Sequence, residues 1–134
     1  MRVANEFAKM SYATRLQVGC VVVKKRNIIS HGYNGTPPGE DNACEDEHGC
    51  TKPDVSHAEE NALMKLCASS MSSRGATVFI THSPCINCAK LLANAKIKTV
   101  YFLQHYRSTE GVSYLRRRKI EVIKIDLEGN KIDD

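Results

Sequence analysis

Two short segments of the sequence carry side chains suited to binding a metal ion and moving a proton. They are His57-Ala58-Glu59 and Pro84-Cys85-Ile86-Asn87-Cys88. Cys85 and Cys88 are three residues apart, so on a helix they share one face and can hold one ion together. With His57 they supply three ligands. Zinc prefers four, so one position is left for water, as in catalytic rather than structural zinc sites.

Glu59 is the remaining reactive group, and the ligand set does not need it. Zinc lowers the pKa of a bound water from near 15.7 to roughly 7, and a nearby carboxylate can take the released proton and pass it to a substrate. The two segments therefore predict a zinc-dependent hydrolase that acts on a small ring carrying an amino group. A C-x-x-C segment alone would also fit a redox pair or half of a structural zinc site. The histidine and the glutamate together favour catalysis.

Hydrophobic periodicity predicts the elements that must hold these residues in place. The expected helices cover residues 2–13, 58–67, 85–94 and 110–118, and the expected strands cover residues 19–23, 28–33, 76–81, 99–103 and 120–125. Ser56 is expected to cap the second helix, and Pro84 is expected at the first position of the third.

This order of elements predicts one α/β domain over residues 1–134. The first two strands should form an antiparallel hairpin at one side of the sheet. Each later strand follows a helix, which implies parallel crossovers and helices on both faces of a five-stranded mixed sheet. Such a crossover brings the helix start at His57 beside the helix start at Cys85. Both then lie at the strand ends, where open α/β sheets place their sites.

Four cysteines lie outside the two segments. Cys20 and Cys67 are expected to be core thiols, because free cysteine behaves as a small hydrophobic residue. Residues 34–56 form a polar, acidic and irregular stretch, and loops of this size are more often functional than idle. Three side chains in this stretch offer ligands for a second metal, without an obvious fourth: Cys44, His48 and Cys50.

The composition bears on the cellular setting and the partners. The net charge is +4 and there is no extended basic arm, so a nucleic-acid partner is not expected. No segment reaches the ~18 consecutive apolar residues that span a bilayer, and the N-terminus has no apolar core of signal-peptide length. The protein is therefore expected in the cytoplasm, without a membrane partner. In that compartment six cysteines favour metal ligands and buried thiols over disulfides.

The chain resembles the cytidine deaminase-like superfamily, and within it the deoxycytidylate (dCMP) deaminase family, from about residue 18 to residue 122. The pattern H-x-E followed by P-C-x-x-C is that of zinc-dependent deaminases. The discriminating segment is G-Y-N-G-x-P, because free-cytidine and tRNA-adenosine deaminases share the zinc motif without that whole segment. The residues that carry the resemblance are Val18-Gly19, 32–37, Gly39, Asp41, 57–62, Ser83-Pro84-Cys85 and Tyr106.

This resemblance implies a three-layer α/β/α cytidine deaminase-like fold. It also implies the hydrolysis of dCMP to dUMP and ammonia, which supplies dUMP for thymidylate synthesis. His57, Cys85 and Cys88 would bind the catalytic Zn²⁺. Water would attack C4 of the cytosine while Glu59 carries the protons.

The resemblance implies substrate contacts as well. Asn34 would contact the deoxyribose or the base, the Ala58 backbone would position the ring, and the carbonyl of Ser83 would face the leaving amine. The contacts implied on the phosphate side are Asn61 and Tyr106, with Arg15 and Arg107 as helpers.

Regulation is the last implication of the resemblance. Such enzymes are commonly hexamers, activated by dCTP and inhibited by dTTP, each with Mg²⁺. The loop from residue 33 to residue 41 resembles their effector-binding region, with Tyr33, Gly35 and Asp41 as expected contacts. Three alternatives stay open. They are turnover of another cytosine nucleotide such as dCTP, deamination of a base within nucleic acid, and a non-catalytic zinc-stabilised module that senses nucleotides.

Overall fold

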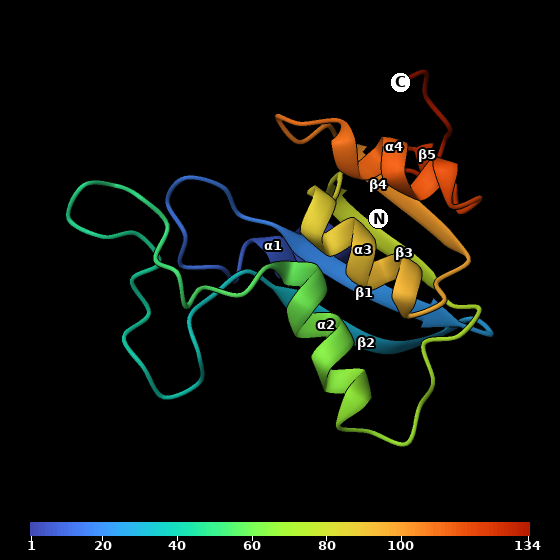
Figure 1. The fold of residues 1–134 in the computed structure, drawn as a ribbon. Helices are drawn as coiled ribbons and strands as arrows, with labels where there is room; N and C mark the ends of the chain where they lie inside the picture. The colour runs from blue at the N-terminus through green and yellow to red at the C-terminus, as the bar shows by residue number, and fades with distance from the viewer.

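The computed structural model describes all of residues 1–134, built around one five-stranded sheet (Figure 1). The elements in chain order are α1 (Arg2–Ala8), β1 (Gly19–Lys24), β2 (Asn27–Tyr33), α2 (Ala58–Cys67), β3 (Thr77–His82), α3 (Ile86–Asn94), β4 (Thr99–Gln104), α4 (Glu110–Arg117) and β5 (Glu121–Lys124). This is the predicted order of helices and strands. None of the four helices has the length and apolar character that crossing a membrane requires.

The sheet has the strand order β2-β1-β3-β4-β5. β1 is antiparallel to both of its neighbours, and β3, β4 and β5 run parallel. One row of paired valines crosses four of the strands: Val22, Val78, Val100 and Val122. β-branched residues suit such a pleated surface, and the predicted mixed sheet with an antiparallel hairpin at one side is confirmed.

Three layers make up the fold, with α2, α3 and α4 on one face of the sheet and α1 on the other (Figure 1). The main core lies between the sheet and the three helices. Fully burying a large apolar side chain there contributes about 1.5–3 kcal/mol. Core residues from the strands include Val22, Ile80, Val100 and Phe102, and those from the helices include Ala62, Leu66, Leu92 and Leu115. The predicted α/β/α layering is therefore confirmed.

The start of α2 differs from the prediction. Ser56 does not cap this helix, because its backbone pairs with Gly35 and closes the base of the long loop after β2. His57 is the N-cap instead. The Glu60 carboxylate accepts a hydrogen bond of 2.8 Å from the His57 backbone N–H, so a residue of the first turn fixes the helix start.

The start of α3 is displaced by one residue in the same way. Pro84 is not the first helical residue, because Cys85 is the N-cap and Ile86 begins the helix. The Cys85 Sγ accepts from the Cys88 backbone N–H at 3.5 Å. A thiol thus takes the capping role that a hydroxyl or carboxylate usually has.

Two other predictions need correction. α1 ends at Ala8 rather than near residue 13, and the chain then turns through Ser11, whose hydroxyl donates to the carbonyl of Asn34 at 2.8 Å. Cys67 is exposed. It follows Leu66, which faces the core, and each residue rotates by about 100° around a helix of 3.6 residues per turn. Cys20 is buried, as predicted.

Gly111, the second residue of α4, sets how closely α4 packs against the start of α3. A Cβ atom at this position would lie 2.0 Å from the carbonyl oxygen of Pro84 and 2.9 Å from the carbonyl carbon of Cys85. Both of these are backbone atoms, which cannot move aside as a flexible side chain can. Any side chain at 111 must therefore displace the segment that carries Cys85.

We expect Gly111→Ala to destabilise the protein by about 1–3 kcal/mol, the usual cost of overpacking. Helix propensity alone would change stability in the opposite direction, because alanine is favoured over glycine inside helices by about 1 kcal/mol. Urea unfolding measures the difference, and Ser113→Ala, at an exposed position of the same helix, is the matched control. A Gly111→Ala variant at least as stable as the wild type would contradict the close approach.

Candidate metal centre

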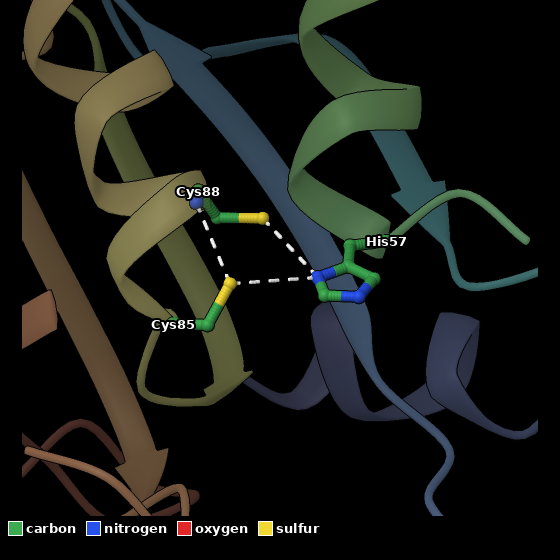
Figure 2. Close-up of side chains that lie close together, drawn as sticks. All are labelled: His57, Cys85 and Cys88. Carbon is green, nitrogen blue, oxygen red and sulfur yellow. Dashed lines mark hydrogen bonds between the residues drawn. The ribbon is translucent and has the colours of Figure 1, made fainter. Parts of the chain in front are cut away.

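Three side chains from two helix starts converge on one point (Figure 2). His57 Nδ1 lies 3.7 Å from Cys85 Sγ and 3.3 Å from Cys88 Sγ. All three potential ligand atoms lie within 4.8 Å of one another, and no other group of three or more such side chains is close enough to hold an ion. The structure therefore brings the predicted ligands together.

The topology explains this convergence. α2 and α3 cover the same face of the sheet and start at the same end of it (Figure 1). His57 caps α2 and Cys85 caps α3, while Cys88 lies in the first turn of α3. Backbone N–H groups at helix starts carry partial positive charge, which favours thiolate and carboxylate there.

The protonation of the three side chains shows what a metal ion would replace. Hydrogen bonding to Cys88 lowers the pKa of Cys85 to about 4. Hydrogen bonding to Cys85 raises the pKa of His57 to about 9, and hydrogen bonding to Cys85 raises the pKa of Cys88. These raised pKa values favour protonated His57 and Cys88 in the metal-free chain, and a cation bound by the three side chains would release those protons.

The donor set fits zinc. One imidazole nitrogen and two sulfurs are borderline-soft ligands of the kind that zinc prefers. Tetrahedral zinc bonds of roughly 2.0–2.3 Å set nitrogen and sulfur ligands about 3.5 Å apart. The two nitrogen–sulfur distances of 3.3 and 3.7 Å bracket this value. Three protein ligands leave one of four positions open.

Glu59 is a buried residue that lines the same cavity as His57 and Cys85. It lies in the first turn of α2 and is 4% exposed. Burial, which disfavours the charged carboxylate, raises its pKa from 4.5 to about 7. A carboxyl group poised near neutrality can both accept and donate a proton.

The centre opens into a cavity of about 390 Å³. His57, Glu59 and Cys85 line it, together with six of the residues expected to contact a substrate: Arg15, Asn34, Ala58, Ser83, Tyr106 and Arg107. A cavity of this volume is at the lower end of the usual range for small-molecule sites.

Asn34 holds one wall of the cavity in place. Its Oδ1 accepts from the Val18 backbone N–H at 2.9 Å, and its Nδ2 donates to the Leu16 carbonyl at 2.7 Å. These bonds fix the segment before β1. Because a primary amide has two N–H donors, one remains for another partner.

Ser83 and Tyr106, which also line the cavity, join the ends of β3 and β4. The Ser83 backbone N–H donates to the Gln104 carbonyl at 2.9 Å, and the Ser83 hydroxyl accepts from the Tyr106 N–H at 2.7 Å. The Arg107 guanidinium lies 5.5 Å from the centre of the Tyr106 ring. This arrangement holds a cation beside an aromatic ring at the cavity wall.

One expected substrate contact, Asn61, does not line the cavity, and the expected effector contacts Tyr33, Gly35 and Asp41 lie outside it as well. The Asn61 amide donates to the Tyr33 carbonyl at 2.7 Å and so ties α2 to β2. Gly35 pairs with Ser56, and the exposed Asp41 accepts from the Ala43 N–H at 3.1 Å. Their contacts hold α2, β2 and the long loop around the cavity, although none of them lines it.

Sequence reasoning missed several lining residues. The Glu45 carboxylate accepts from the Thr14 N–H at 3.1 Å, the Thr14 hydroxyl at 3.0 Å and the Arg15 N–H at 3.4 Å. It therefore links the long loop to the segment that carries Arg15. No sequence signal marks this contact. His82 and His105 also line the cavity, and their positions next to the ends of β3 and β4 were a usable signal.

A second metal site at Cys44, His48 and Cys50 is not present, because these side chains are not gathered around a common point. Cys44 is buried, while His48 and Cys50 are exposed. The segment is a short hairpin in which Glu45 pairs with Thr51. Its turn is held by the Asp46 carboxylate, which accepts backbone N–H groups of the same segment.

The sheet order and the His-Cys-Cys centre together define a protein of the cytidine deaminase-like class. The family described as the cytidine and deoxycytidylate deaminase zinc-binding region matches residues 1–104. The chain therefore belongs to this family, as the motifs predicted.

Individual relatives agree with this placement. ComE operon protein 2 of Bacillus subtilis is 36% identical over 113 residues, covering 81% of this chain and 59% of that protein. A probable deoxycytidylate deaminase of Caenorhabditis elegans is 38% identical over 112 residues, covering 78% and 55%. The chain thus spans little more than half of these two relatives. The crystal structure of dCMP deaminase from the cyanophage S-TIM5, in complex with dCMP and dUMP, superposes with a TM-score of 0.91 at 46% identity over 92% of each chain.

In the zinc-free protein, we expect Glu59 to make stability fall as pH rises. The folded chain holds this proton up to a pKa of about 7, against 4.5 ordinarily, so it binds more protons than the unfolded chain between those values. Linkage then lowers the free energy of unfolding through that window, by at most about 3 kcal/mol at 1.36 kcal/mol per pH unit. Glu59→Gln removes this titration. In urea unfolding with a chelator, the free energy of unfolding of the variant should rise relative to that of the wild type from pH 4.5 to pH 7. Parallel pH profiles would contradict the raised pKa of Glu59.

Proposed function

We propose that this protein catalyses the hydrolytic deamination of dCMP to dUMP and ammonia. The observation that carries the proposal is the position of the buried Glu59 carboxyl beside the His57, Cys85 and Cys88 ligands, in a cavity of about 390 Å³. The substrate rests on similarity to the cyanophage enzyme, whose structure contains dCMP and dUMP. Asn34 lines the same cavity, and it belongs to the segment 32–37 that, by the family resemblance, distinguishes dCMP deaminases.

Glu59 moves the protons in this mechanism. His57, Cys85 and Cys88 would hold a zinc ion, which would supply a Lewis acid that brings the pKa of water close to neutrality. Glu59 takes a proton from the attacking water and delivers it to N3 of the ring as C4 becomes tetrahedral. It then takes the second proton from the hydroxyl on C4 and delivers it to the amine as the C4–N bond breaks, so that water and dCMP become dUMP and ammonia. Burial, which raises the pKa of this carboxyl to about 7 in the metal-free chain, helps it hold a proton between the two transfers.

Backbone and amide groups orient the ring in the proposal. The Ala58 N–H lies at the start of α2, where helix N–H groups are unpaired. The Ser83 carbonyl faces the leaving amine. The remaining N–H of the Asn34 amide serves the deoxyribose or the base.

Two cations serve the phosphate in the proposal. Arg15 and Arg107 line the cavity, and neither takes part in an ion pair within the molecule. Tyr106 lies beneath the Arg107 guanidinium. Two unpaired guanidiniums favour a substrate that carries phosphate over a free nucleoside. Asn61 acts indirectly through the strand end at Tyr33.

Regulation and assembly extend the proposal beyond the catalytic cavity. We propose activation by dCTP and inhibition by dTTP, each with Mg²⁺, and assembly into a hexamer. Tyr33, Gly35 and Asp41 are the proposed effector contacts, in the loop after β2. The product dUMP would serve thymidylate synthesis in the cytoplasm. These parts rest on the family resemblance.

An ultraviolet assay for loss of the cytosine amine tests the substrate assignment. We expect dCMP to give the highest kcat/KM among dCMP, CMP, cytidine and dCTP. The two arginines favour a phosphate over free cytidine, and the preference over CMP and dCTP rests on similarity to the cyanophage enzyme. Effector control predicts that added dCTP raises the rate with dCMP and that dTTP lowers it. If dCTP were turned over with the highest kcat/KM, dCTP rather than dCMP would be the substrate. Competition by single-stranded DNA would point to a base within nucleic acid.

The variant Glu59→Gln should retain zinc and lose about 10²- to 10⁴-fold in kcat, the usual contribution of general acid–base catalysis. Glu60→Gln is the matched control, because its amide oxygen can still accept the N–H of His57 and it should keep normal turnover. Metal analysis and the ultraviolet assay measure both properties. Normal turnover by Glu59→Gln would refute the mechanism and would favour a module that only senses nucleotides.

A further inference from the structure

A surface remote from the metal centre collects cations. The β1–β2 turn and the turns that lead into β3, β4 and β5 lie at the end of the sheet opposite the long loop after β2 (Figure 1). Backbone hydrogen bonds join neighbouring turns, from Gly75 N–H to the Lys96 carbonyl at 2.8 Å and from Lys98 N–H to the Ala76 carbonyl at 2.9 Å. We call this surface the basic end, and define it by six exposed cations: Lys25, Arg26, Arg74, Lys96, Lys98 and Lys119.

The cations of the basic end have no acidic partners within the molecule. None of the six takes part in an ion pair. No aspartate or glutamate occurs between residues 61 and 109, and Glu121 is the one acidic residue next to these turns. Acidic residues cluster instead in the loop from 40 to 54, near the cavity. The net charge of +4 thus conceals a separation of charge along the molecule.

Four cations of the basic end have a left-handed backbone conformation, which is independent of their charge. The non-glycine residues with positive φ are Lys25 (51°), Arg26 (67°), Lys96 (62°) and Lys119 (64°), and all four belong to this surface. Glycine or asparagine adopts this conformation at lower cost. Helix dipoles favour cations after α3 and α4, but no helix ends at the β1–β2 turn, where Asn-Gly is the preferred pair. Positions suited to glycine therefore carry charge.

We propose that the basic end binds the phosphate backbone of nucleic acid. Its cations stand on four neighbouring turns rather than around one pocket, and three strand spacings of roughly 4.8 Å make a row about 14 Å wide. A phosphate polymer can meet such a row at several points, whereas a mononucleotide cannot. These turns carry no aromatic side chain, so the contacts are to phosphates rather than stacked bases, and binding is independent of base sequence.

The basic end is separate from the catalytic cavity. The cavity lies at the starts of α2 and α3, whereas the basic end includes the turns that follow α3 and α4. Nucleic acid bound there does not enter the active site and is not a substrate. Binding at the basic end therefore does not depend on the reaction proposed above, and it holds the protein beside nucleic acid.

Fluorescence anisotropy with a labelled 20-nucleotide single strand and a 20-base-pair duplex tests the proposal. With about four phosphates contacted, log affinity should fall against log salt with a slope of roughly −3 for the single strand and −4 for the duplex. Scrambling the base sequence should leave affinity unchanged. Absence of salt-dependent binding in low salt, or strong dependence on sequence, overturns the proposal.

The decisive variant combines Lys25→Asn, Arg26→Gly, Lys96→Gly and Lys119→Gly. These residues suit left-handed turn positions, so the variant should melt no lower than the wild type and deaminate normally. We expect its affinity for nucleic acid to fall by at least about tenfold, with a flatter salt slope. The control removes four exposed or half-exposed cations elsewhere, to the same net charge: Arg2→Gln, Lys9→Gln, Lys52→Gln and Lys131→Gln.

The control should bind within about twofold of the wild type. Equal losses of affinity in both variants would mean that net charge alone drives binding. Unchanged affinity in the basic-end variant would mean that these cations do not bind nucleic acid. Either result overturns the proposal. Polyglutamate and vesicles containing phosphatidylserine are the competing anions. If either competes as well as nucleic acid at equal charge concentration, the surface binds anions in general and the assignment to nucleic acid is wrong.

Discussion

The meeting of two helix starts at one end of the sheet is the constraint on which the centre depends. His57 caps α2 and Cys85 caps α3, so each ligand lies where the backbone turns from extended to helical. Close packing keeps these turns in place. A Cβ atom at Gly32 would lie 2.5 Å from the Ala58 carbonyl oxygen, and one at Gly111 would lie 2.0 Å from the Pro84 carbonyl oxygen, just before α3. Loss of either approach would separate the ligands without touching any of them.

Local pattern and spacing account for what the sequence could predict. Hydrophobic periodicity marked each helix and strand, and the C-x-x-C spacing placed Cys85 and Cys88 on one turn. The crossover rule brought His57 beside them, since successive helices on one face start at the same end. Helix boundaries were less certain, because capping depends on individual hydrogen bonds. Glu60 reaches the His57 N–H, and Ser56 is engaged with Gly35 instead.

Features that depend on the path of a loop or on the whole surface could not be predicted. The reach of Glu45 to Thr14 follows from how the long loop folds back, and no local signal encodes it. Asn61 lies one turn from His57, yet its amide is taken by the Tyr33 carbonyl. The net charge of +4 argued against nucleic acid, but a sum cannot show that six cations gather at one end of the sheet while the acidic loop lies at the other (Figure 1). The active site and the basic end therefore lie at opposite ends of the same sheet.

The central claim is that three side chains hold one zinc ion, with a fourth position open beside Glu59. X-ray absorption at the zinc edge of the zinc-loaded protein measures the number and type of ligands directly. The account predicts two sulfur ligands at about 2.3 Å and two nitrogen or oxygen ligands at about 2.0–2.1 Å. Four protein ligands with three or more sulfurs, or a shell without sulfur, would contradict it.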